Sequence, residues 1–94
     1  VNTGEESTKS GILQKDLKEF IKFCTDEKGL KICGLMCIPP INENPAHHFN
    51  LLSKLVKLYN LEKLSIGMSN DYEIAINYDA TYIRVGTALF GQRN

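Results

Sequence analysis

Two short turns in the second half of the chain combine a glycine with a hydroxyl side chain. Gly67-Met68-Ser69 ends a short apolar run, and Gly86-Thr87 ends a β-rich run. A helical pattern separates the two runs, so they are predicted to form a βαβ unit with parallel strands. Parallel neighbours bring their carboxyl ends to one edge of a sheet. Backbone N–H groups and hydroxyls at helix N-termini there bind anions, and the sequence therefore predicts a phosphate site at Ser69, Gly86 and Thr87.

The same residues also have a structural interpretation. Ser69 is suited to cap the helix that follows it, since Asn70 and Glu73 stand at the spacing of a capping box. Gly86 is suited to a tight turn of any kind. The two turns nevertheless lie on adjacent strands of one unit, which favours the phosphate hypothesis.

Helices and strands alternate along the chain. Apolar residues recur at helical spacing over residues 12–28, 45–60 and 70–78, and β-rich runs cover residues 30–38, 62–67 and 81–86. The predicted buried stripes are Leu13, Leu17, Phe20 or Ile21, and Cys24 in the first helix; Phe49, Leu52, Leu55 or Val56, and Tyr59 in the second; Tyr72, Ala75 and Ile76 in the third. This order predicts an α/β fold whose strands are parallel neighbours in chain order, with the helices on one side.

The predicted sheet is small. Residues 1–3 read as the last piece of a strand, and only three complete strands follow it. Parallel sheets need both faces covered and their edges protected. We therefore expect residues 1–94 to be a single partial domain within a larger fold.

Composition excludes several function classes. Eleven basic and eleven acidic residues cancel, so no basic stripe indicates nucleic acid, and the longest apolar runs are too short to span a bilayer. His47 and His48 are adjacent and lack the spacing of metal ligands, so both are predicted to lie on the surface.

Three cysteines are present, and no pair has C-x-x-C spacing. Cys24, Cys33 and Cys37 are predicted to be reduced and to behave as small hydrophobic residues of an intracellular protein.

Four segments resemble a known family: NTGEESTKSG, GLMCIPP, LSIGMSNDYEIAI and TYIRVGTALFG. Together they resemble the C-terminal half of the pyridoxal phosphate homeostasis proteins, which share a barrel with the N-terminal domain of alanine racemase. The resemblance implies the C-terminal half of a (β/α)8 TIM-type barrel. It also implies a cytoplasmic protein that carries pyridoxal 5'-phosphate (PLP) without turnover. A racemase-type PLP enzyme of fold type III and a generic phosphate-binding barrel fragment are the alternatives.

The resemblance assigns roles to individual residues. It implies that Ser69, Gly86 and Thr87 bind the cofactor phosphate, the site already predicted from the turns. It places Met68 near the cofactor and Arg84 near the pyridine nitrogen, where an arginine keeps that nitrogen unprotonated. A salt bridge inside the barrel mouth is the alternative role for Arg84.

The chain departs from the family pattern in two ways. Asp79 stands where the family usually has glycine, and aspartate tolerates the left-handed backbone conformation better than most residues. The family's Schiff-base lysine lies on the first strand, in the N-terminal half that is absent here, and Lys9 is the only lysine expected near the barrel mouth. We therefore expect these residues alone to be non-catalytic, to hold no PLP covalently, and to pair with the N-terminal half or with a second copy.

Overall fold

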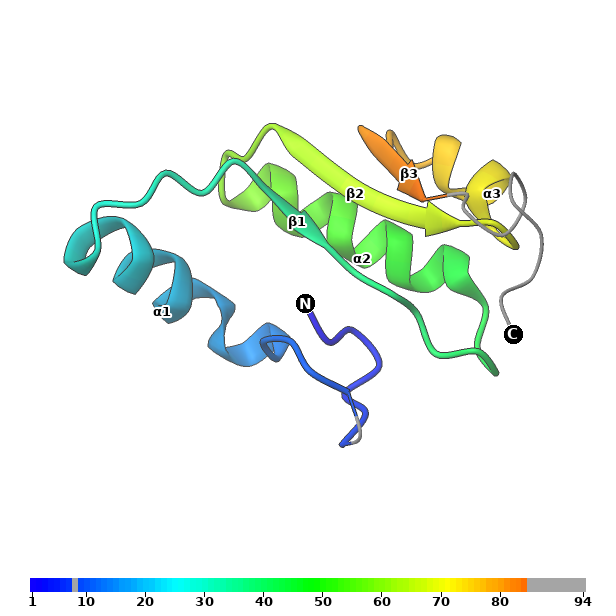
Figure 1. Cartoon of the computed structure of the whole chain (residues 1–94), viewed down its shortest axis with the longest axis horizontal. Helices are drawn as coiled ribbons and strands as arrows, with labels where there is room; N and C mark the ends of the chain where they lie inside the picture. The colour runs from blue at the N-terminus through cyan, green and yellow to red at the C-terminus, as the bar shows by residue number, and fades with distance from the viewer. Residues whose placement is uncertain (8, 85–94) are drawn as a thin grey trace.

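A three-stranded parallel sheet forms the centre of the structure. The structure is a computed structural model that describes residues 1–7 and 9–84. The strands β1 (Gly34–Met36), β2 (Lys63–Met68) and β3 (Tyr82–Arg84) lie in the order β1-β2-β3, and both pairs are parallel (Figure 1). The predicted strand order and pairing are confirmed.

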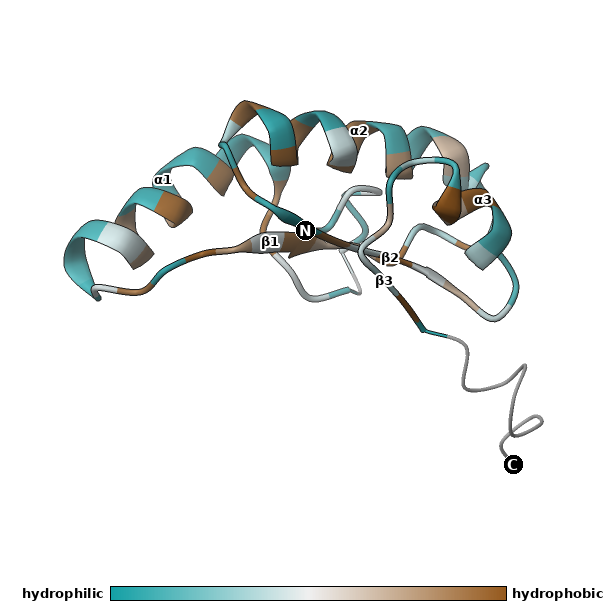
Figure 2. Ribbon diagram, turned by 90° about the horizontal axis from the view of Figure 1, so that it is seen from above, coloured by the Kyte–Doolittle hydropathy of each residue, from teal (hydrophilic) through white to brown (hydrophobic). Residues whose placement is uncertain are grey.

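The helices fill the connections between the strands. A turn of 3-10 helix (Gln14–Asp16), α1 (Leu17–Lys22) and a π-helical turn (Phe23–Glu27) precede β1, α2 (Pro45–Leu58) joins β1 to β2, and α3 (Tyr72–Ile76) joins β2 to β3. All three α-helices lie on one side of the sheet, as predicted, and leave its other face open (Figure 2).

Local sequence signals explain where the helices begin and end. Asn44 caps α2 by accepting a hydrogen bond from the backbone N–H of Ala46 at 3.0 Å, and Pro45 takes the first helical position. Gly29 has φ +63° and Leu30 N–H donates to the carbonyl of Cys24 at 2.9 Å, a Schellman-type stop. Asp79 has φ +63°, so it does adopt the left-handed conformation expected of it.

The core lies between the sheet and the helices. Its fully or nearly fully buried members are Leu17, Cys37, Phe49, Leu52, Leu55, Val56, Leu64, Ile66 and Ala75. Both residues left open in the second stripe, Leu55 and Val56, are buried, whereas in the first stripe Ile21 packs against the core and Phe20 remains exposed. Ile76 was wrongly included in the third stripe, because it is 57% exposed on a helix of five residues.

Three further predictions are wrong. His48 is buried, because it continues the α2 stripe next to Phe49 and its Nε2 finds Glu43 Oε1 at 3.1 Å. Cys33 is exposed, because β1 covers only three residues and begins after it. Residues 1–3 do not form a strand. Val1 N donates to Met36 O at 2.7 Å, but the Asn2 side chain bonds the backbone of Glu6: its Nδ2 donates to Glu6 O at 2.8 Å and its Oδ1 accepts from Glu6 N–H at 3.1 Å.

In the part of the chain that the structure describes, no helix has the length and apolar character needed to cross a membrane.

Gly67 is expected to tolerate no side chain. Its φ is +95°, and a Cβ there would lie 2.7 Å from Ala75 Cβ and 3.2 Å from Tyr72 Cα. Gly29, at φ +63°, has open space around it and serves as the matched control. Gly67→Ala should lower the free energy of unfolding by about 3 kcal/mol, as backbone strain and overpacking combine. Gly29→Ala should cost only about 1 kcal/mol. Denaturant unfolding of the intact protein measures both, and equal losses would contradict the proposed packing of α3 on β2.

Candidate functional site

The carboxyl ends of the three strands meet at one edge of the sheet. Met68, the last residue of β2, is paired with Arg84, the last residue of β3, with an irregularity in the ladder just before them. Ser69 follows Met68 in the turn toward α3. The structure therefore brings together three of the five predicted cofactor-binding residues, while Gly86 and Thr87 lie outside the described residues.

The turn after β2 is held by an aspartate. Asp71 Oδ1 accepts a hydrogen bond from the backbone N–H of Met68 at 2.6 Å, and Asp71 N–H donates to Met68 O at 3.1 Å. The predicted capping box of Asn70 and Glu73 does not form, because the N-cap of α3 is Asp71 and its carboxylate points back to Met68. Ser69 thus lies, half-buried, inside a closed turn.

Arg84 reaches across the open face of the sheet. Its Nη1 donates to Ser65 Oγ on β2 at 2.5 Å, and its Nη2 donates to the carbonyl oxygen of Cys37, just after β1, at 3.1 Å. One guanidinium therefore joins all three strands. Within residues 1–7 and 9–84 Arg84 forms no ion pair, so the salt bridge considered for it is not found there.

The third nitrogen of this guanidinium is different. Arg84 Nε is buried and has no hydrogen-bond partner among the described residues. A buried donor without a partner costs free energy.

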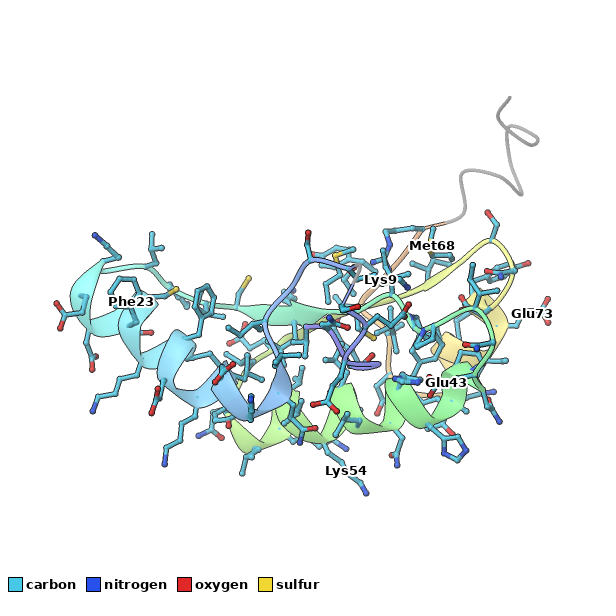
Figure 3. All side chains as sticks on the ribbon, turned by 90° about the horizontal axis from the view of Figure 1, so that it is seen from below. Lys9, Phe23, Glu43, Lys54, Met68 and Glu73 are labelled. Atoms are coloured by element: carbon cyan, nitrogen blue, oxygen red, sulfur yellow. The ribbon has the colours of Figure 1, made fainter. Side chains whose placement is uncertain are left out.

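The open face is apolar around the two polar groups. The ladder places Ser65 directly opposite Met36 on β1 and Tyr82 on β3, and those two side chains are 44% and 55% exposed. Met68 lies on the side of the sheet away from α2 (Figure 3). The face thus presents a hydroxyl and a guanidinium between thioether and aromatic groups.

A cavity of about 410 Å³ lies between β1 and the N-terminal segment, lined in part by Lys9, Met36 and Ile38. Lys9 Nζ lies 3.5 Å from the carbonyl of Pro39, which follows the end of β1, and 3.1 Å from Glu6 Oε1. Lys9 therefore lies close to the carboxyl end of β1, where its ammonium is engaged by these two oxygens. Its place at a barrel mouth stays a prediction.

The cysteine nearest the site, Cys37, is buried. Burial raises the pKa of the Cys37 thiol to about 11. No group of three or more His, Cys, Asp or Glu residues in the described ranges is arranged to hold a metal.

Ser65 and Asp71 were not singled out from the sequence. A signal for Ser65 did exist: it stands between Leu64 and Ile66, so the alternation of a strand sends it to the opposite face from that apolar pair. Asp71 gave no such signal, because its bond runs backward along the chain, to a residue that lies before the helix.

Comparison with known proteins adds the family. The model of the alanine racemase N-terminal domain matches residues 1–94. The chain is 43% identical over 102 residues to the pyridoxal phosphate homeostasis protein of Aquifex aeolicus, covering 99% of this chain and 45% of that protein. It is 42% identical to the protein of the same name from Pseudomonas aeruginosa, covering 100% of this chain and 43% of that protein.

A solved structure has the same fold. PipY of Synechococcus elongatus PCC7942, solved without PLP, superposes with a TM-score of 0.71 at 32% identity, over 92% of this chain and 45% of PipY. The chain thus spans less than half the length of the relatives it matches. The predicted fold class, the C-terminal half of a (β/α)8 barrel with parallel strands alternating with helices, is confirmed.

The Asp71 bond predicts a local effect on the turn. Asp71→Ala removes the acceptor of the Met68 amide and should lower the free energy of unfolding by about 1–2 kcal/mol. Asp71→Asn keeps an acceptor oxygen and should lose less. Hydrogen exchange of the Met68 amide in the intact protein reports the bond directly, since exchange should be faster in Asp71→Ala. Unchanged exchange in that variant would show that the carboxylate does not hold the turn.

Thiol labelling should follow burial and pKa. At pH 8 Cys33 is exposed and should react first with iodoacetamide, whereas Cys37 stays protonated and buried. Peptide mass mapping of timed samples checks the order of labelling, and labelling of Cys37 as fast as Cys33 would contradict it.

Because the folded state raises the pKa of Cys37, its contribution to stability is complete below pH 9 and is lost as the pH rises through about 11.

Proposed function

We propose that this chain, which belongs to the family of the alanine racemase N-terminal domain, supplies the phosphate-binding side of a PLP site in a larger PLP homeostasis protein. Its two relatives named above carry that function in their names and are more than twice its length. The remaining part of the site, including the lysine that holds the cofactor covalently, is proposed to come from the rest of the barrel.

The observation that carries the proposal is the unpartnered donor on Arg84. Its Nε is buried on the face that becomes the interior of a closed barrel, and a pyridine nitrogen is an acceptor without a hydrogen of its own. Met68, paired with Arg84 in the ladder, provides apolar contact for an aromatic ring. The residues present therefore fit the ring end of PLP.

The phosphate end is proposed to lie in the turn after β2. Ser69 offers a hydroxyl there, and the Met68–Asp71 hydrogen bonds fix the turn that presents it. Arg84 is paired with Met68, the residue that precedes this turn. Gly86 and Thr87 are therefore proposed to complete the phosphate contacts with backbone N–H and hydroxyl groups.

The charge of Arg84 bears on the protonation of the cofactor ring in the carrier and racemase hypotheses alike. Its two hydrogen-bond partners, the Ser65 hydroxyl and the Cys37 carbonyl, are neutral, so the positive charge is not cancelled by them. A positive charge next to the ring nitrogen opposes its protonation. PLP supplies an electron-withdrawing ring when bound, and an unprotonated ring withdraws electrons less strongly. A racemase-type enzyme is the second candidate, and release of substrate α-hydrogen to solvent distinguishes it.

The setting of the site belongs to the same proposal. We place the protein in the cytoplasm, with PLP as its ligand and with neither nucleic acid nor membrane as a partner. The open face of the sheet is covered by the N-terminal half of the barrel, or by a second copy of the chain when that half is removed.

Two hydroxyl deletions test the phosphate site. In the intact protein Ser69→Ala and Thr87→Val should each weaken PLP binding by about tenfold or more, since a hydrogen bond to a charged group contributes about 1.5–3 kcal/mol. Ser53→Ala, on α2, is the matched control and should bind as the wild type does. Calorimetric titration measures the affinities. Wild-type affinity in both site variants would overturn the phosphate assignment, and absence of binding in the wild type would overturn the function.

A further inference from the structure

We propose that Ser65 is a positioning residue for Arg84: it orients the guanidinium toward the ring of the bound cofactor and takes no part in holding the phosphate. The inference rests on the function proposed above and assigns a role to a residue in the middle of β2, away from the turns that were expected to form the site.

Two of the three guanidinium nitrogens of Arg84 are hydrogen-bonded, and the third is not. Ser65 Oγ accepts from Nη1 and Cys37 O accepts from Nη2, so both terminal nitrogens are anchored, one to β2 and the other to the segment just after β1. Two anchors fix the plane and the rotation of a rigid, planar group. The remaining nitrogen, Nε, is the one without a partner among the described residues. The anchors therefore decide where that free donor points.

Of the two acceptors that hold the Arg84 guanidinium, only the one on Ser65 depends on the identity of a side chain. The Cys37 acceptor is a backbone carbonyl and is present whatever side chain stands there, whereas the Ser65 acceptor exists only because this side chain has a hydroxyl. Leu64 and Ile66 on either side of it carry the packing of β2 against the helices. The hydroxyl lies on the opposite face and is not needed for that packing.

Removing the hydroxyl leaves the guanidinium on a single anchor. Arg84 then samples several side-chain rotamers, and binding a ring nitrogen requires the favourable one to be selected again. The contacts to the phosphate lie at the other end of the cofactor, in the turn that Asp71 holds. The change should therefore affect recognition of the ring and leave recognition of the phosphate intact.

The test compares two probes on the intact protein. Ser65→Ala should weaken PLP binding by about three- to tenfold, part of the effect of a hydrogen bond to a charged group. Its affinity for inorganic phosphate, measured by competition against PLP, should stay at the wild-type value. Ser69→Ala should weaken both probes. Ser65→Thr restores a hydroxyl on a β-branched residue suited to a strand and should recover PLP binding.

A second readout needs no ligand. The side-chain N–H signals of Arg84 in the ¹⁵N spectrum of the ligand-free protein should broaden or exchange faster in Ser65→Ala and return in Ser65→Thr. Thr81→Val is the control for a lost hydroxyl in the same sheet. Thr81 Oγ1 accepts from Leu64 N–H at 2.9 Å and has no hydrogen bond with Arg84 among the described residues. This variant should leave the Arg84 signals in place.

The outcomes separate the two proposals. Wild-type PLP affinity and unchanged Arg84 signals in Ser65→Ala would overturn the positioning role while leaving the proposed function standing. Equal weakening of PLP and inorganic phosphate would also overturn it, because it would show a general loss of structure. A wild-type protein that binds inorganic phosphate but not PLP would overturn the proposed function itself.

Discussion

Parallel pairing of β2 with strands on both sides is the constraint on which the site depends. Parallel strands require a crossover through a helix, so α2 and α3 cover one face of the sheet and every strand ends at the same edge. The pairing of Met68 with Arg84 depends on a register shift between Ser65 and Met68, because a regular ladder continuing from Ser65 and Tyr82 would pair Gly67 with Arg84. Gly67 makes the arrangement compact, because its positive φ and its missing Cβ let α3 pack close to the end of β2. A side chain there would separate the helix from the turn that carries Ser69.

Much of the fold could be predicted because its signals are local. Gly29 ends a helix because it adopts a positive φ. Asn44 caps the start of α2, and Pro45, which has no N–H, takes its first position. Each of these signals acts within a few residues of the chain. The alternation of elements then fixed the parallel order. Asp79 could be recognised as a left-handed residue from the resemblance alone, because aspartate replaced a glycine. The resemblance placed Met68 and Arg84 near the cofactor, whereas their pairing depends on a register shift in the ladder that the sequence did not indicate.

The remaining features depend on side-chain contacts that were not predicted from the sequence. His48 is buried because Glu43, five residues earlier, meets its ring from the loop before α2. Asp71 bonds backward to Met68 instead of capping α3, a choice made by the geometry of the turn. The partners of Arg84 are 19 and 47 residues away, and no periodicity in the sequence relates them. The contacts that give the site its chemistry are thus the ones that only the folded chain brings together.

The hydrogen bonds of Arg84 illustrate how such long-range contacts affect both stability and binding. A guanidinium on a largely apolar face loses hydration, and two neutral acceptors compensate for only part of that loss. Leaving Nε buried and unpartnered is unfavourable for the described part of the fold. The same arrangement is favourable for binding, because the donor is already oriented and desolvated when an acceptor arrives, so little is lost on ordering it. The unpartnered Nε therefore lowers the folding stability of the sheet, and a ligand whose acceptor bonds that nitrogen removes this cost when it binds.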